Sequence, residues 1–271
     1  MLAAVGVPSA IEFDRDGYKL LVEAEHEAGA RSHLQAYELE RRAPRPPRPI
    51  AVSALPYAWV GSLCYALVLI GIALAVDNGW WRLDAFDLGQ LDAAQVQHGQ
   101  WWRGWTALTL HLDGPHLAAN LGAGIWFGYL AAAVIGSGTA WLLAVNGAAL
   151  ANLIEGWFGP AAHRSVGAST AVFCALGLLV AYTWQRRLQL PQSWASRWAP
   201  LVAGAVLLGW FGSEGEGTDV VAHLLGFLVG GLLGVAAARP PLERWLARLP
   251  QWLAGALTLL VLAAAWTCAL S

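Results

Sequence analysis

Two residues with the chemistry of a nucleophile and a base lie near the starts of two apolar segments. Ser169 belongs to the segment 168–185, and His223 belongs to the segment 219–238. A serine hydroxyl becomes an effective nucleophile when a neutral imidazole within hydrogen-bond reach takes its proton. If both segments cross a membrane in the same direction, the two side chains lie at a similar depth. The pair therefore predicts nucleophilic catalysis.

Two further polar residues lie near the start of a third apolar segment, 113–134. His116 and Asn120 are four residues apart, so on one helix they face the same way and are able to aim hydrogen-bond donors at one point. Donors arranged in this way stabilise the negative charge that develops on a carbonyl oxygen under attack. The spacing therefore predicts an oxyanion hole.

The composition places these residues in a membrane. Hydrophobic residues make up 57% of the 271 positions and charged residues 13%, about half of the roughly 25% that is usual in soluble domains. A membrane-spanning helix needs about 20 mainly apolar residues. Seven candidate spans meet that template, at 53–76, 113–134, 138–156, 168–185, 198–213, 219–238 and 250–270. The predicted fold is an all-α, polytopic membrane helix bundle.

The fourth and sixth spans carry small residues at close spacing, which allow the backbones of membrane helices to approach each other. These residues are Ala171, Ala175 and Gly177 in the fourth span and Gly226, Gly230 and Gly234 in the sixth. We expect the two spans to pack together and so to hold Ser169 beside His223.

The residues ahead of the first span are polar and carry mixed charge. Apolar residues in 10–42 recur roughly as on one face of a helix, which favours a small amphipathic helical segment; they are Leu20, Leu21, Leu34 and Leu39. The proline-rich run 43–49 predicts an extended spacer. No secretory signal peptide is recognisable, so we expect the first span to direct insertion.

Basic residues predict the orientation. If the N-terminus is cytoplasmic, 13 of the 16 Lys and Arg residues lie inside, and only Arg82, Arg103 and Arg164 lie outside. The positive-inside rule therefore favours a cytoplasmic N-terminus and, with seven spans, an outer C-terminus. The tryptophan-rich stretch 77–105 then lies at the outer membrane interface.

Charge and cysteine content exclude several functions. The net charge of −2 gives no field that would attract nucleic acid. Three cysteines, Cys64, Cys174 and Cys268, lie in apolar stretches far apart in sequence, and an odd number cannot form a closed disulfide framework. The cysteine spacing suggests no metal cluster, and a serine mechanism implies no metal and no organic cofactor.

Four motifs together resemble those of rhomboid intramembrane proteases. They are Trp102-Arg103, His111-x4-His116-x3-Asn120, Gly167-Ala168-Ser169 and Ala222-His223-x2-Gly226-x3-Gly230. The match spans 101–234, with the motifs in the family's order and on the corresponding helices. The resemblance implies a six-helix catalytic core, here 51–238, preceded by a cytoplasmic segment, 1–50, and followed by a linker and a seventh helix, 239–271.

The resemblance also implies roles for individual residues. Ser169 would be the nucleophile and His223 the general base, while His116, Asn120 and the Ser169 amide would stabilise the oxyanion. The supporting residues would be Gly167, Phe173, His111, Arg103, Gly226 and Gly230. The expected reaction is hydrolysis of peptide bonds in transmembrane segments of other proteins, in the lipid bilayer of the cell membrane.

Two positions depart from the family pattern. Thr170 stands where glycine usually follows the serine, and Phe173 stands where tyrosine is usual. The Thr170 departure keeps open an alternative, an inactive relative that binds transmembrane helices and steers their trafficking or degradation. A transporter or channel is a third reading, but the chain lacks evident inverted repeats or paired intramembrane charges.

Other ionisable residues near the outer surface are given simpler interpretations. Asp219, one turn before His223, is expected to cap the sixth span rather than to complete a catalytic triad. His98 and His163 lie in outer loops without partner ligands at metal spacing, so they are expected to be solvated. Glu155, near the outer end of the third span, is expected to be interfacial.

Overall fold

The computed structural model describes residues 5–14, 17–42, 55–80, 84–212 and 218–271. The chain divides into two compact units, Met1–Ile50 and Ala51–Ser271. The proline-rich spacer at 43–49 and the beginning of the first predicted span at 53 lie outside the described residues.

The N-terminal unit corrects the prediction of one helical segment over 10–42. Strands β1 (Ser9–Asp14) and β2 (Gly17–Val22) form an antiparallel hairpin, followed by the 3₁₀ turn η2 (Ala24–His26) and helix α1 (Glu27–Arg42). The first half alternates apolar and polar residues with the period of two that suits a strand. Across the hairpin the rings of Phe13 and Tyr18 lie 5.0 Å apart. Leu20 and Leu21 therefore belong to a strand, and only Leu34 and Leu39 lie on a helix.

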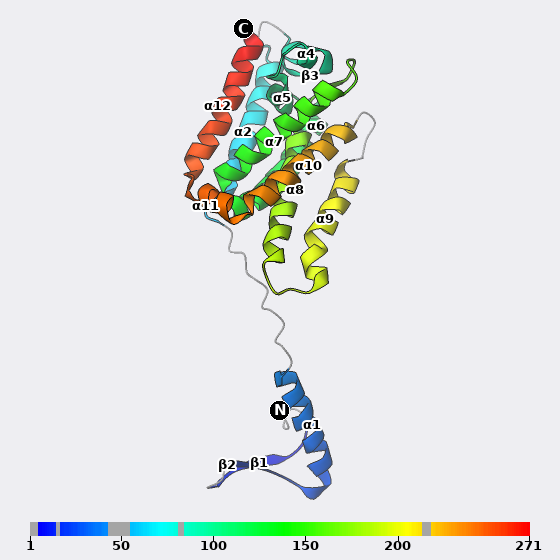
Figure 1. Ribbon diagram of the computed structural model, residues 1–271, viewed down its shortest axis with the longest axis vertical. Helices are drawn as coiled ribbons and strands as arrows, with labels where there is room; N and C mark the ends of the chain where they lie inside the picture. Colours follow the sequence, from blue (N-terminus) through cyan, green and yellow to red (C-terminus); the bar gives the residue numbers. More distant parts are fainter. Residues whose placement is uncertain (1–4, 15–16, 43–54, 81–83, 213–217) are drawn as a thin grey trace. The chain divides into compact units, whose positions relative to one another are not determined.

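The second unit is a bundle of long helices (Figure 1). They are α2 (Ala58–Asp77), α6 (Gly114–Ile135), α7 (Ser137–Phe158), α8 (Ser169–Leu188), α9 (Trp194–Gly212), α10 (Val220–Ala237) and α12 (Gln251–Leu270), with the shorter α11 (Pro240–Arg248) before the last. Each of the seven predicted spans corresponds to one of these long helices. The prediction of an all-α, polytopic membrane bundle is confirmed.

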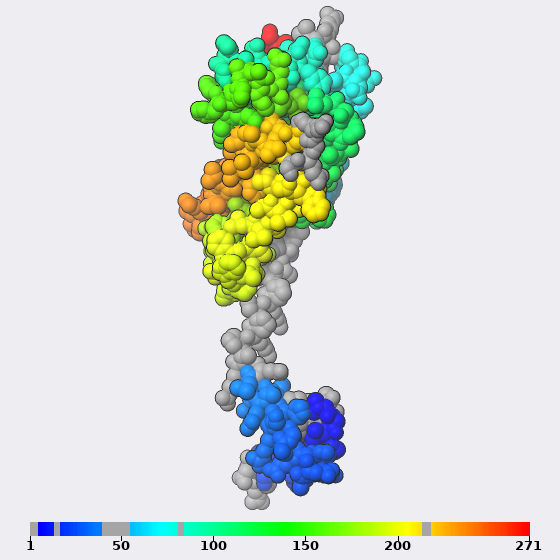
Figure 2. Space-filling view, turned by 90° about the vertical axis from the view of Figure 1, so that its right-hand side faces the viewer, coloured from blue at the N-terminus to red at the C-terminus, as the bar shows by residue number. Residues whose placement is uncertain are grey.

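Among the described residues, five helices are long and apolar enough to cross a membrane: α2, α6, α7, α10 and α12. Helices α8 and α9 form where spans four and five were predicted but are not among these five. The last turn of α8 carries Arg186 and Arg187, and α9 contains Pro200. Figure 2 shows α9 (yellow) on the surface of this unit, beside α10 (orange).

Helices α8 and α10 form the most extensive helix contact of the bundle. A Cβ atom added to Gly226, Gly230 or Gly234 would collide with a backbone carbonyl oxygen of α8. These oxygens belong to Thr170, Cys174 and Leu178, which repeat at the same four-residue spacing. Only glycine allows this approach, and in lipid such contacts supply much of the packing energy. The close packing of the two helices is thus present, and it fixes the beginning of α8 against the beginning of α10.

Several short helices and one short strand connect α2 to α6. They are α3 (Ala85–Gly89), β3 (Leu91–Asp92), α4 (Ala93–Gln97), α5 (Arg103–Thr106) and η3 (Ala107–Thr109), and β3 pairs with β4 (Arg164–Ser165). The buried Arg103 donates to the backbone oxygens of Gln90 and Asp87 at 2.7 and 2.8 Å. Arg103 therefore holds this segment in its fold.

An ion pair joins this segment to the loop before α8. The Arg164 Nε lies 2.9 Å from the Asp92 carboxylate. Burial raises the pKa of Asp92, but hydrogen bonds from the Gln95 amide and Arg164 outweigh it, so the net pKa is lowered. Asp92 therefore stays ionised, and its partner Arg164 stays paired.

Candidate active site

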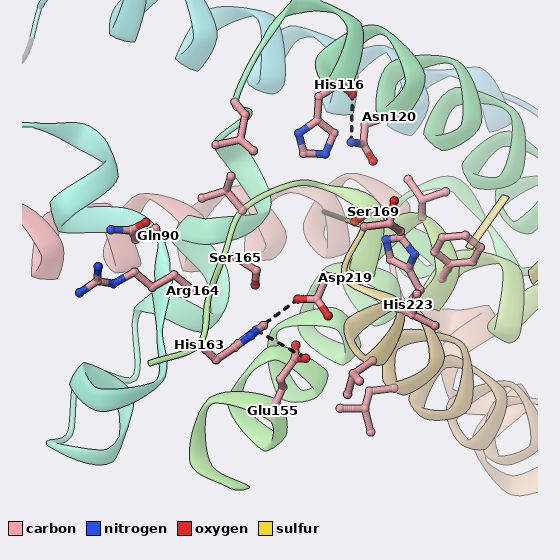
Figure 3. A pocket seen from close by; sticks show the side chains of 18 of the residues that line it. Gln90, His116, Asn120, Glu155, His163, Arg164, Ser165, Ser169, Asp219 and His223 are labelled. Atoms are coloured by element: carbon pink, nitrogen blue, oxygen red, sulfur yellow. Dashed lines mark hydrogen bonds and ion pairs between the residues drawn. The ribbon is translucent and has the colours of Figure 1, made fainter. Parts of the chain in front are cut away.

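One open cavity of about 1330 Å³ brings the predicted site residues together (Figure 3). Ser169, His223, His116 and Asn120 all line it. They come from the beginnings of three helices, α8, α10 and α6. Each side chain lies near a helix N-terminus, so the cavity opens at one end of the bundle rather than in its middle.

Ser169 is the first residue of α8, and Gly167 shapes the chain before it. Gly167 has a φ of +134°, a conformation that residues with a side chain rarely adopt. A Cβ atom at this position would also lie 2.8 Å from the His116 Nε2. The Gly167 amide donates to the Ala107 carbonyl oxygen at 3.0 Å. Glycine therefore allows the loop to turn beside His116 before it delivers Ser169 to the cavity.

His111 holds the same loop from the other side. The Ala168 amide donates to the His111 Nε2 at 3.3 Å, which requires this nitrogen to be unprotonated. Burial, followed by the nearby His116, lowers the pKa of His111 to about 4, although a backbone contact with Thr109 opposes the shift. His111 is thus neutral at physiological pH and acts as an acceptor for the backbone next to Ser169.

His223 is buried, and its ring is held on two sides. The Nδ1 lies 2.9 Å from the carbonyl oxygen of Gly212, the last residue of α9. The ring of Phe173 lies against the imidazole, with a distance of 4.5 Å between ring centroids. A carbonyl oxygen only accepts hydrogen bonds, so the proton of the neutral imidazole lies on Nδ1. This tautomer leaves the Nε2 as a base.

Asp219 caps α10, as predicted. Its Oδ1 accepts a hydrogen bond of 3.0 Å from the Ala222 amide. The group that contacts the His223 Nδ1 is the Gly212 carbonyl and not this carboxylate. The capping interpretation is confirmed.

His116 and Asn120 lie one turn apart in the first part of α6. Asp113 caps this helix and accepts from the His116 amide at 2.7 Å. The Asn120 Nδ2 donates to the His116 carbonyl at 3.1 Å, and Asn120 is buried. A side-chain amide has two N–H donors, so this bond leaves one for a group in the cavity. Figure 3 shows both side chains on the helix above Ser169.

Thr170 points away from the cavity, which it does not line. Its side chain is buried, and its Cγ2 would lie 3.1 Å from a Cβ atom at Gly226. Thr170 thus belongs to the contact between α8 and α10. Its branched side chain therefore does not narrow the cavity beside Ser169.

Two features of the site were missed by sequence reasoning. The Gly212 carbonyl carries no side-chain signal, so only the fold reveals it beside His223. His163 was expected to be solvated and without partners, which is wrong. Its Nε2 lies 3.2 Å from Asp219 and 3.6 Å from Glu155. These carboxylates come from two other segments, so no local sequence pattern links them to His163.

The comparison with known families covers most of this site. The family model of the rhomboid domain matches residues 98–240. This region holds 143 of the 271 residues, just over half of the chain, and includes Ser169, His223, His116 and Asn120. No curated protein is significantly similar in sequence to this chain.

Proposed function

The chain belongs to the rhomboid family, and from this premise we propose that it is an active intramembrane serine endopeptidase. The observation that carries the proposal is the shared cavity of Ser169 and His223, with the His223 Nδ1 held by the Gly212 carbonyl. Family membership alone does not separate active proteases from inactive relatives. The presence of both residues in one cavity supports the active reading.

In the proposed reaction the Ser169 hydroxyl attacks the carbonyl carbon of a peptide bond. The His223 Nε2 takes the hydroxyl proton and later gives it to the leaving amine, and water then hydrolyses the acyl-enzyme. The Gly212 carbonyl stabilises the imidazolium, because its oxygen accepts a stronger hydrogen bond from a charged donor. The Gly212 carbonyl thereby orients and stabilises the histidine, as the carboxylate of a catalytic triad does.

His116 and Asn120 are assigned to the developing oxyanion, together with the Ser169 amide. The Ser169 amide is at the N-terminal end of α8, where backbone N–H groups lack partners within the helix. Such donors stabilise charge that exists only in the transition state. No step requires a cofactor.

We propose transmembrane segments of other proteins as the substrates. The chain is a multi-pass membrane protein, so a substrate in the same bilayer reaches the cavity by lateral diffusion. Carbonyl groups in an intact helix are tied up in backbone hydrogen bonds. Segments with helix-weakening residues and small side chains near the cut are therefore the expected substrates.

The alternative of an inactive, helix-binding relative rested on Thr170. Because this side chain faces α10 and does not line the cavity, Thr170 does not support that alternative.

Covalent labelling tests the proposal. A fluorophosphonate probe reacts with an activated serine and should label the purified protein but not the Ser169→Ala variant. Ser165→Ala is the matched control, because Ser165 lines the same cavity without a place in the mechanism. Labelling that persists in Ser169→Ala, or is lost in Ser165→Ala alone, would assign the nucleophile elsewhere. Absence of labelling in all three proteins would support the inactive alternative.

A further inference from the structure

Three ionisable side chains from different segments of the chain meet in the cavity. Glu155 lies near the end of α7, His163 in the following loop, and Asp219 at the beginning of α10. Their ligand atoms all lie within 4.8 Å of one another. Figure 3 shows Asp219 and Glu155 directed at His163 from two sides. The proposed proteolytic mechanism uses none of the three side chains.

The cluster holds three buried side-chain atoms without hydrogen-bond partners among the described residues, one from each of its members. The Glu155 side chain is only 5% exposed, and its Oε2 has no hydrogen-bond partner among the described residues. The His163 Nε2 and the Asp219 Oδ2 are close enough for an ion pair, but their geometry does not make a hydrogen bond. The adjacent Arg164 is paired with Asp92. A buried polar atom without a hydrogen-bond partner is costly and points to a missing ligand or ion.

We propose that Glu155, His163 and Asp219 form a binding site for a divalent transition-metal ion of the Zn²⁺ type. Zinc binds imidazole nitrogen and carboxylate oxygen at about 2.0 to 2.2 Å, which in a tetrahedral site separates ligand atoms by roughly 3.4 Å. The His163 Nε2 lies 3.2 Å from the Asp219 carboxylate and 3.6 Å from the Glu155 carboxylate, and these two distances bracket this value. One nitrogen with two carboxylates favours zinc over calcium or magnesium, which prefer oxygen ligands.

The local structure holds the ligands in place. The two carboxylate oxygens of Asp219 have different partners: Oδ1 caps α10, and Oδ2 faces His163. The His163 carbonyl accepts a hydrogen bond from the Ala93 amide at 3.1 Å, which anchors the loop. All three side chains line the open cavity, and three protein ligands leave a fourth position on zinc for water.

The bound ion would join the end of α7, the loop before α8 and the beginning of α10. Asp219 lies one helical turn before His223, so the ion would also restrain the part of α10 that carries the general base. Any ligand that binds only the folded state raises its stability. Zinc should therefore raise the thermal unfolding temperature of the protein.

Metal binding is tested on the full chain, purified in detergent, treated with a chelator and then titrated with ZnCl₂. Calorimetry and elemental analysis should show one tightly bound zinc ion for each chain. Glu155→Gln, His163→Ala and Asp219→Asn should each raise the dissociation constant at least roughly tenfold. Asparagine still caps a helix, so Asp219→Asn removes the ligand and keeps the cap. His98 is an exposed histidine outside the cluster, so His98→Ala serves as the control and should bind zinc as the wild type does.

Two further variants separate this site from the histidines of the proposed proteolytic mechanism, His116 and His223. If zinc is instead bound by His116 or His223, binding should be lost in His116→Ala or His223→Ala and kept in His163→Ala. That result would overturn the proposal. Absence of stoichiometric binding in the wild type would also overturn it, as would unchanged affinity in Glu155→Gln. Because the readouts are metal content and unfolding temperature, they stand whether or not the protein cleaves a substrate.

Discussion

The Nδ1 of His223 lies 2.9 Å from the carbonyl oxygen of Gly212. This contact joins the last residue of α9 to the first turns of α10 and fixes the imidazole tautomer without a carboxylate. Phe173 covers one side of the same ring. The proposed base is thus oriented by a backbone group and a hydrophobic ring, both of which depend on how α8, α9 and α10 pack.

Ser169 and His223 are predicted to act as one catalytic unit. Ser169→Ala and His223→Ala should each reduce cleavage of a transmembrane substrate to background, a loss of up to roughly 10⁶-fold. The double variant should be no worse than either single variant, because a base without a nucleophile contributes nothing. Steady-state cleavage in detergent or proteoliposomes measures all three. Additive losses would mean that the two residues act in separate steps.

Asn120 is predicted to act on turnover rather than on substrate binding. Asn120→Ala should lower the turnover number by about 10² to 10³, or roughly 3 to 4 kcal/mol in the activation barrier. The charge it stabilises is absent from the ground state, so KM should change little. His116→Ala should show a similar but larger effect. A raised KM with intact turnover would instead identify Asn120 as a substrate-binding residue.

Thr170 is predicted to affect stability and not catalysis. Thr170→Gly should cost about 0.5 to 1 kcal/mol through helix propensity, with more lost from its buried methyl contact with α10. Turnover at a temperature where both proteins are folded should stay unchanged. Val172→Ala is the matched comparison, because Val172 lines the cavity and should alter cleavage. Faster cleavage by Thr170→Gly would show that the threonine restricts the site.

The lowered pKa of His111 predicts how the free energy of unfolding depends on pH. Its pKa falls from 6.5 in the unfolded chain to about 4 in the folded protein, so between these values the unfolded chain binds more protons. Its contribution to stability is therefore complete above pH 6.5 and is lost as the pH falls towards 4. Thermal unfolding from pH 4 to 7 measures this slope. His111→Asn, which keeps an acceptor but does not titrate, should flatten it.

The membrane orientation is predicted from the basic residues, and thiol labelling tests it. In a chain with all three native cysteines replaced, cysteines at Asp87 and Ser271 should react with an impermeant reagent from outside intact cells. A cysteine at Ala28 should not react until the cells are opened. All three positions are exposed in the folded protein, so protection would reflect the membrane and not burial. Labelling of Ala28 in sealed cells would reverse the topology.

The sequence by itself determined the class of this protein and its candidate site. Long apolar segments have few alternatives to membrane helices. Motifs at fixed helical spacing predict Ser169, His223, His116 and Asn120 as the candidate site residues. The glycine stripe of α10 also predicted its partner helix, because small residues matter where backbones touch. These signals are local, because each motif lies within a single segment of the chain.

Only the tertiary structure decided which distant groups meet. The side that Thr170 faces, the carbonyl of Gly212 beside His223, and the approach of His163 to Glu155 and Asp219 each depend on packing between segments. In the N-terminal unit, helix and strand periodicities compete over a few residues, and the hairpin of β1 and β2 replaced the expected helix. Backbone carbonyls and contacts between loops leave no mark on residue type, so spacing along the chain could not predict them.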